Sequence, residues 1–124
     1  MTAQAIKPRT GYYTTTDNFV ANLRFADGSV GSLTYTALGS KDHPKERLEV
    51  YVDGKVLVMD DYLTLTVTGA RAKGVESRLQ QKGHLEELQA FARCIRQGGE
   101  WPIPLWEQIQ ATEISFEVEK FLRD

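Results

Sequence analysis

The sequence of 124 residues has little of several residue types that mark particular classes of protein: one cysteine, two histidines and four prolines. A single cysteine, Cys94, excludes an internal disulfide bond and fits a reducing cytoplasm. We interpret it as a semi-buried structural thiol and not as a nucleophile. Cysteines and histidines do not cluster, so we expect no metal site. No apolar run approaches the length of a membrane span, and no signal-peptide pattern opens the chain.

Charge of one sign is not in excess either. Lys and Arg number 15 against 17 Asp and Glu, which gives a net charge of −2 and a pI of about 5.7. A protein that binds nucleic acid or an anionic membrane usually carries a basic surface, so we expect neither partner. With 41% hydrophobic and 26% charged residues, the composition is ordinary. The length predicts one domain over residues 1–124, and the single cysteine predicts a cytoplasmic protein.

Two Asp-Gly pairs, each between β-prone runs, predict two hairpins. Asp-Gly suits a two-residue type I′ turn, which needs positive φ at both central residues. The first hairpin would join residues 18–26 to 29–37, with Phe25 opposite Val30. The second would join 48–52 to 55–59. Three further segments complete the expected strands: 62–68 alternates cleanly, 2–6 fits an edge strand, and 12–16 fits either a strand or a loop.

In these registers both hairpins carry apolar residues on two faces. One predicted face holds Leu48, Val50, Leu57 and Met59; the opposite, open face holds Leu33, Tyr35, Tyr51, Val56 and Val58. A solvated antiparallel sheet usually alternates more sharply. We therefore expect the open face to be covered by a second copy or by further protein, giving a homo-oligomer. The alternative is an ordinary sheet with a few exposed apolar residues.

The last third of the chain predicts two helices. Residues 69–82 are polar and basic, as in a mobile excursion. Residues 84–97 have helical apolar spacing and end at Gly98, so Phe91 and Ile95 are expected in the core. Residues 105–122 are apolar on two opposite sides, which predicts burial between two layers. Strands first and helices last predict an α+β fold: a largely antiparallel, open-faced sheet with two C-terminal helices packed on one face.

Few residues offer chemistry. Lys41, His43 and Lys45 share the polar loop 39–46, and either bind the hydroxyls or anionic group of a substrate or are ordinary solvated residues. His84 opens a helix, where it either caps and packs or contacts a ligand. Asp60 and Asp61 are interpreted as the end of a strand. No Ser-His-Asp arrangement can be placed, so no catalytic residue is assigned.

The segments D-N-F-V (17–20), L-R-F-A-D-G-S (23–29), D-G-K-V-L-V-M-D-D-Y (53–62), K-G-H-L-E-E-L-Q-A-F (82–91) and W-P-I-P (101–104) together resemble the C-terminal domain of the Gfo/Idh/MocA oxidoreductases. The likeness extends over about residues 17–122. The runs are most similar to the branch in which this part follows a zinc-type alcohol-dehydrogenase-like part. The resemblance implies an α+β domain that accompanies a Rossmann domain for NAD or NADP.

The resemblance also implies a role without catalysis of its own. The family's Glu-Lys-Pro motif does not occur in this sequence, and neither does a G-x-G-x-x-G turn, so no cofactor site is expected in these residues. We expect the substrate-side and oligomerisation domain of a dehydrogenase of sugars or polyols. Loop 39–46, with Lys82 and His84, would face the cofactor domain. The rival hypothesis is a stand-alone ligand-binding or dimerisation module with no enzymatic role.

Overall fold

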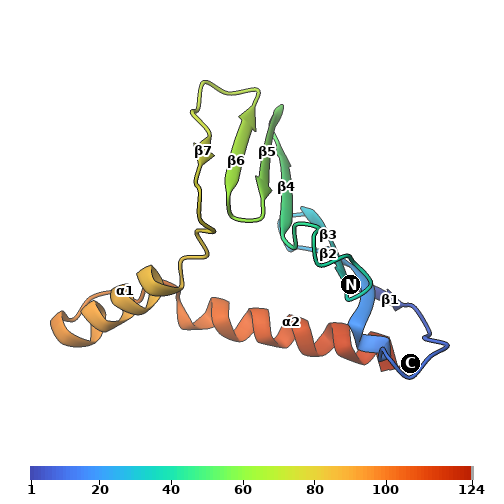
Figure 1. Ribbon diagram of the computed structural model, residues 1–124. Helices are drawn as coiled ribbons and strands as arrows, with labels where there is room; N and C mark the ends of the chain where they lie inside the picture. Colours follow the sequence, from blue (N-terminus) through green and yellow to red (C-terminus); the bar gives the residue numbers. More distant parts are fainter. Residues whose placement is uncertain (124) are drawn as a thin grey trace. The chain divides into compact units, whose positions relative to one another are not determined.

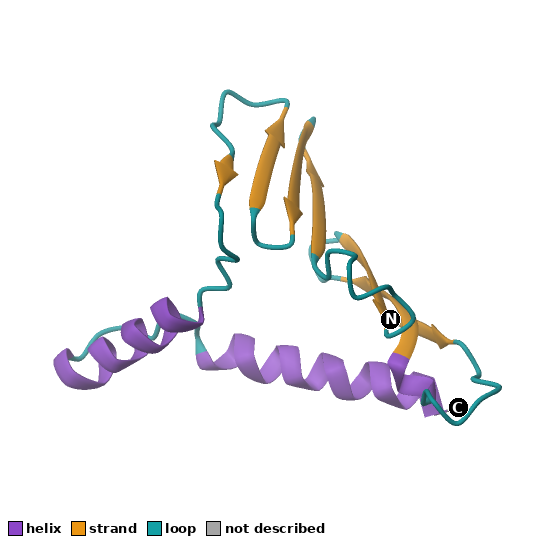
Figure 2. Ribbon diagram, viewed as in Figure 1, coloured by secondary structure: helices purple, strands orange, loops and turns teal. Residues whose placement is uncertain are grey.

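The chain has the expected α+β fold with antiparallel sheets, as Figures 1 and 2 show for the computed structural model, which describes residues 1–123. It divides into two compact units. The first comprises Met1–Gly39 and the chain from Gly99 onward, and the second comprises Ser40–Gly98. Each unit has its own antiparallel sheet, so the strands form two sheets where the sequence predicted one.

The first unit is a three-stranded sheet with a helix against it. The strands are in the order β1-β2-β3. Its elements are β1 (Thr2–Ala5), the short 3-10 helix η1 (Thr15–Asp17), β2 (Asn18–Arg24), β3 (Val30–Thr36) and α2 (Leu105–Arg123). Helix α2 packs against β1 and η1. The core consists of Ala21, Val118 and Leu122, with Ala3, Ala5 and Phe19 packed around them.

The first hairpin does not have the two-residue turn that its Asp-Gly pair predicted. Arg24, and not Phe25, pairs with Val30. The Phe25 amide donates to the Ser29 carbonyl at 2.9 Å and the Gly28 amide to the Phe25 carbonyl at 3.1 Å, which encloses a three-residue loop. Gly28 alone has positive φ in this loop, at 89°. The reason lies in Asp27, whose Oδ1 accepts from the amide and the hydroxyl of Ser29 and so favours the bulged loop over type I′.

A one-residue difference in register changes which side chains share a face. In the structure Phe19 is opposite Tyr35 and Ala21 is opposite Leu33, and the rings of Phe19 and Tyr35 stack with centroids 5.5 Å apart. The other face is mostly polar: it carries Asn18, Val20, Asn22, Arg24, Val30, Ser32, Thr34 and Thr36. The prediction that this hairpin is apolar on both faces was therefore wrong.

The second unit is a four-stranded sheet with one helix. The strands are in the order β4-β5-β6-β7. Its elements are β4 (Arg47–Val52), β5 (Lys55–Asp60), β6 (Thr64–Thr68), β7 (Val75–Glu76) and α1 (His84–Gln97). Here the predicted type I′ turn is confirmed, because Asp53 and Gly54 have φ of 48° and 74° and Val52 pairs with Lys55. Strand β7 lies in the segment that was predicted to be an irregular excursion.

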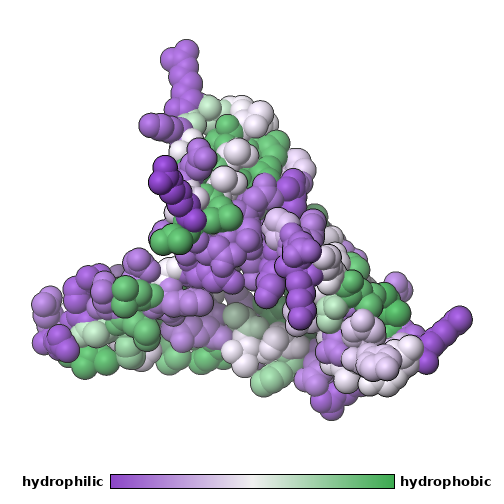
Figure 3. All heavy atoms as spheres, viewed as in Figure 1, coloured by the Kyte–Doolittle hydropathy of each residue, from purple (hydrophilic) through white to green (hydrophobic). Residues whose placement is uncertain are grey.

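One face of this sheet is apolar. Its register places Leu48 opposite Met59, Val50 opposite Leu57, and Leu65 and Val67 beside them on β6. Yet none of the residues from 40 to 98 is buried, and Val50 keeps 41% of its surface exposed. Figure 3 shows apolar side chains at the surface over these strands. Nothing within this unit covers the face completely.

Both helices match their predicted positions, but their burial differs from the prediction. Helix α1 ends at Gly98, as expected, yet Phe91 is 38% and Ile95 is 68% exposed, so their assignment to the core was wrong for this chain. Helical spacing indicates that a face is apolar but does not supply the partner that buries it. Helix α2 buries Val118 and Leu122, whereas Phe116 on its opposite side is 58% exposed. Only one of its two expected layers is therefore present.

Candidate functional site

The turn between β5 and β6 is strained. The Leu63 amide donates to the Asp60 carbonyl at 2.9 Å, and the two central residues, Asp61 and Tyr62, have φ of 49° and 56°. Both lie in the left-handed region, as in a type I′ turn, but neither is glycine. Aspartate tolerates this conformation better than most residues, whereas tyrosine there costs on the order of 1 kcal/mol. Such strain persists where surrounding contacts enforce it, and it often marks functional sites.

Two other segments of the same unit hold the turn in place. The Asp61 amide donates to the Glu46 carbonyl at 2.6 Å, and the Gln81 amide donates to the Tyr62 carbonyl at 3.0 Å. The Lys82 ammonium lies 5.5 Å from the centroid of the Tyr62 ring and 3.8 Å from the Glu46 carboxylate. The turn, the end of loop 39–46 and the irregular segment before α1 therefore form one local structure.

A pocket of about 330 Å³ lies where these three segments meet. It is lined by residues 41–45, by Asp61, and by Gln80 and Lys82. Its volume is at the lower end of the range for small-molecule pockets, which suits a ligand of about monosaccharide size. Because all lining residues belong to the second unit, the pocket does not depend on how the two units are placed. We refer to it as the basic pocket.

Cationic side chains outnumber carboxylates by one in the basic pocket. Lys41, Lys45 and Lys82 line it together with His43, against the two carboxylates of Asp42 and Asp61. Among residues 1–123, no carboxylate lies within ion-pair distance of Lys41 or Lys45. In the same range, Asp61 Oδ1 is buried and has no hydrogen-bond partner. A buried acceptor left in this state is costly, so this oxygen would gain from a donor supplied by a ligand or by water.

The pocket brings together most of the residues that the sequence indicated. Lys41, His43, Lys45 and Lys82 all line it, but His84 does not: it is the first residue of α1 and is exposed. Sequence reasoning missed Asp61, which it interpreted only as the end of a strand. Two alternating β segments separated by Asp61 and Tyr62 were the available signal for a tight turn, and the lack of glycine obscured it.

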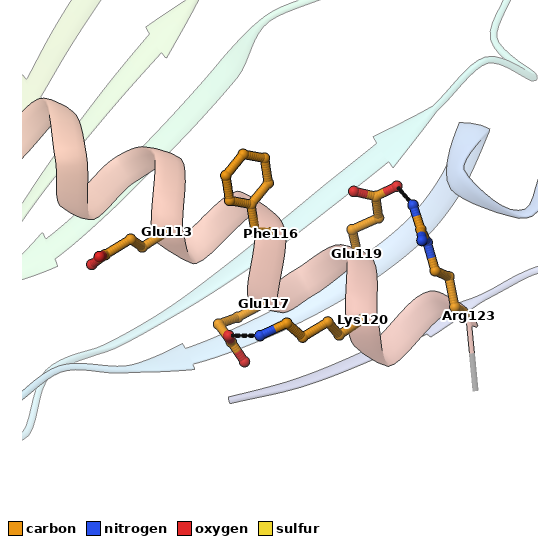
Figure 4. Close-up of a pocket in the computed structure, with 6 residues that line it drawn as sticks. All are labelled: Glu113, Phe116, Glu117, Glu119, Lys120 and Arg123. Atoms are coloured by element: carbon orange, nitrogen blue, oxygen red, sulfur yellow. Dashed lines mark hydrogen bonds and ion pairs between the residues drawn. The ribbon is translucent and has the colours of Figure 1, made fainter.

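A second hollow, shown in Figure 4, is a surface feature of α2 and not a site. Its six lining residues all belong to this one helix: Glu113, Phe116, Glu117, Glu119, Lys120 and Arg123. Glu117 pairs with Lys120, and Glu119 pairs with Arg123. These are the neighbours expected at spacings of three and four residues on a helix. With four of its five charged side chains paired and one helix for a wall, the hollow has little means to select a ligand.

A network of charged side chains and one tyrosine lies on strands β4 and β5, on the face opposite the apolar one. Arg47 Nη1 donates to Asp60 Oδ1 at 2.6 Å, Arg47 Nη2 donates to Glu49 Oε1 at 2.6 Å, and the Tyr51 hydroxyl donates to Glu49 Oε2 at 2.6 Å. The hydrogen bond from Tyr51, followed by that from Arg47, holds the pKa of Glu49 below its usual value. The same carboxylate raises the pKa of Tyr51. All members satisfy one another, so this network is a cross-strand contact.

Three findings concern metal ligands, membrane spans and similarity to known proteins. Within residues 1–123, no three His, Cys, Asp or Glu side chains come together as a metal ion would need. Neither helix in that range combines the length and the apolar character needed to cross a membrane. Comparisons of the chain with protein-family profiles, with curated proteins and with solved structures found no match.

Proposed function

We propose that this chain is the substrate-side and assembly domain of an NAD(P)-dependent oxidoreductase that acts on a secondary alcohol of a sugar or polyol. The observation that carries the proposal is the basic pocket. It gathers Lys41, His43, Lys45 and Lys82 around a surface pocket of about 330 Å³. These are four of the five residues selected as substrate contacts from the loop composition and from the resemblance to the Gfo/Idh/MocA C-terminal domain.

The chemistry of the pocket suits binding and orientation. Ammonium and imidazole groups donate hydrogen bonds to hydroxyl oxygens or to an anionic group, and Asp61 offers an acceptor. Oxidation of an alcohol by hydride transfer relies on a nicotinamide, while the protein supplies orientation and electrostatics. In this proposal the nicotinamide belongs to a Rossmann domain that works together with this chain, and the chain alone is catalytically silent.

The assembly part of the proposal is supported by the apolar face of the four-stranded sheet. Leu48 and Val50 are 55% and 41% exposed there, and Leu57 and Met59 are incompletely covered. Contiguous exposed apolar surface of this kind usually marks a contact with another protein. The sequence predicted the subunit contact on the opposite face, which holds Tyr51, Val56 and Val58 but also the charged side chains of Arg47, Glu49 and Asp60. We propose instead that a second subunit covers the apolar face, which would give a homo-oligomer.

One observation favours a different function, a stand-alone ligand-binding module. The basic pocket is formed within the second unit alone, so binding there needs no further domain. The two proposals differ in whether a dinucleotide-dependent activity accompanies binding. They agree that the pocket takes a small molecule.

The test uses the native polypeptide that contains this sequence, purified from its own cells. We expect it to reduce NAD or NADP in the presence of a panel of sugars and polyols. Lys45→Ala should lower kcat/KM severalfold without changing dinucleotide affinity, because a lost positioning contact acts on the substrate. Lys55→Ala, at the β4–β5 turn and outside the pocket, is the matched control. Equal kcat/KM in wild type and Lys45→Ala would exclude the pocket from substrate binding, and no dinucleotide reduction would favour the binding module.

A further inference from the structure

The basic pocket combines two kinds of group that select different parts of a ligand. Lys41 and Lys45 form no ion pair with a carboxylate within residues 1–123. Asp61 Oδ1 is a buried acceptor that lacks a donor in that same range. A ligand that satisfies both must carry an anionic group and, at another position, a hydrogen-bond donor.

The surroundings of Asp61 decide which donor is suitable. A cationic donor, such as an ammonium group, would be attracted by Asp42 and Asp61 but repelled by the three lysines that line the same pocket. A hydroxyl donates without adding positive charge. A neutral hydroxyl is therefore the better partner for Asp61, while an anionic group suits Lys41 and Lys45 because charge-assisted hydrogen bonds are the stronger kind.

The structure also holds Asp61 ready for this contact. Its backbone is fixed in the left-handed conformation by the β5–β6 turn and by the 2.6 Å hydrogen bond from its amide to the Glu46 carbonyl. Lys82 is held over the Tyr62 ring and beside Glu46, which places a third cation at the same edge. Groups fixed before binding lose little freedom when the ligand arrives, so the arrangement favours affinity.

We propose that the basic pocket binds an acidic sugar or polyol, that is, a polyhydroxylated compound carrying a carboxylate or a phosphate. Lys41 and Lys45 would bind the acid group, and Asp61 would accept a hydrogen bond from a hydroxyl. This deepens the proposed function and rests on it in naming the compound as the substrate of the oxidoreductase. The binding itself concerns this chain alone.

The experiment titrates the isotope-labelled chain with three compounds that differ only at one carbon: glucose, glucuronate and glucose 6-phosphate. Amide shifts in residues 41–45, 60–62 and 80–82 should saturate with glucuronate or with glucose 6-phosphate. Which of the two binds more tightly distinguishes a carboxylate from a phosphate. Glucose should bind at least about tenfold more weakly, since it lacks the charge-assisted contacts. Equal affinity for all three, or no saturable shift with either acid, would overturn the proposal.

Variants separate the two kinds of contact. Lys45→Gln should weaken binding of the preferred acid about fivefold, the scale of one partly exposed charge pair, and leave glucose unchanged. Asp61→Asn, which keeps a residue that tolerates positive φ, should weaken binding of both the acid and glucose. Lys55→Gln, outside the pocket, should change neither the affinity for the acid nor that for glucose. If Lys45→Gln fails to fold, Lys41→Gln replaces it. An unchanged affinity for the acid in a folded lysine variant contradicts the assignment.

The two levels of proposal fail separately. If the native polypeptide oxidises neutral polyols with NAD(P) and the chain does not prefer acids, the ligand class is wrong and the proposed function stands. If the chain binds acidic sugars selectively but the native polypeptide shows no dinucleotide-dependent reaction, the ligand class stands and the enzymatic role is wrong.

Discussion

The sharpest structural prediction compares two isomeric apolar residues on the two helices, Ile95 of α1 and Leu122 of α2. Ile95 is 68% exposed and Leu122 is 8% exposed. Full burial of such a side chain is worth about 1.5–3 kcal/mol, and a cavity adds to the cost of truncating a buried one. Leu122→Ala should therefore destabilise the first unit by about 2–4 kcal/mol. Ile95→Ala should cost under about 1 kcal/mol, because it removes less buried area and alanine favours the helix.

Urea unfolding followed by circular dichroism measures the overall change in free energy. Hydrogen exchange resolved by segment then assigns the change to a unit, since local opening reports local stability. Leu122→Ala should reduce protection in β2 and α2, and Ile95→Ala should leave both unchanged. A loss above about 2 kcal/mol for Ile95→Ala would show that α1 packs into a core of this chain and would refute the reasoning.

Three other predictions concern the cofactor, the apolar sheet face and the strand network. Calorimetric titration of the chain with NADH or NADPH should be flat, because the sequence has no glycine-rich turn to hold a pyrophosphate; a micromolar dissociation constant would contradict it. The chain should self-associate in light scattering at tens of micromolar, and Val50→Glu on the apolar face should weaken association more than Thr66→Glu on the opposite face; equal effects would place the contact elsewhere. The pKa of Glu49 is lowered and that of Tyr51 is raised. The contribution of their hydrogen bond to the free energy of unfolding should therefore be lost as pH falls through the Glu49 pKa or rises through the Tyr51 pKa. NMR titration showing ordinary pKa values for both would disprove the network.

How far the sequence predicts the structure depends on whether the deciding contacts are local. The Asp53-Gly54 turn and the Gly98 helix end follow from local backbone preference, and both are as predicted. The Asp27-Gly28 loop carries the same dipeptide, but Ser29 binds the Asp27 side chain and changes the loop and the register. A two-residue motif does not contain that information.

The burial of helix residues and the composition of the basic pocket also depend on contacts that are not local in sequence. Spacing identified an apolar face on α1, but Phe91 is 38% exposed in the structure. The sequence of a helix shows which of its faces is apolar and does not show which surface covers that face. Lys41, His43 and Lys45 were selected by the composition of one loop, and Lys82 was selected through the resemblance. Asp61 was not, since its role depends on the turn geometry and on Glu46, which is distant in sequence.

The central claim is that the basic pocket holds the substrate of a dinucleotide-dependent oxidoreductase. The most direct measurement is the rate of NAD(P) reduction by the native polypeptide with glucuronate, glucose 6-phosphate and neutral polyols, for the wild type, Asp61→Asn and Lys55→Gln. We expect turnover with at least one of these classes, a severalfold lower kcat/KM for Asp61→Asn, and no change for Lys55→Gln. Turnover that is unaffected by Asp61→Asn, or the absence of any dinucleotide-dependent reaction, would contradict the account.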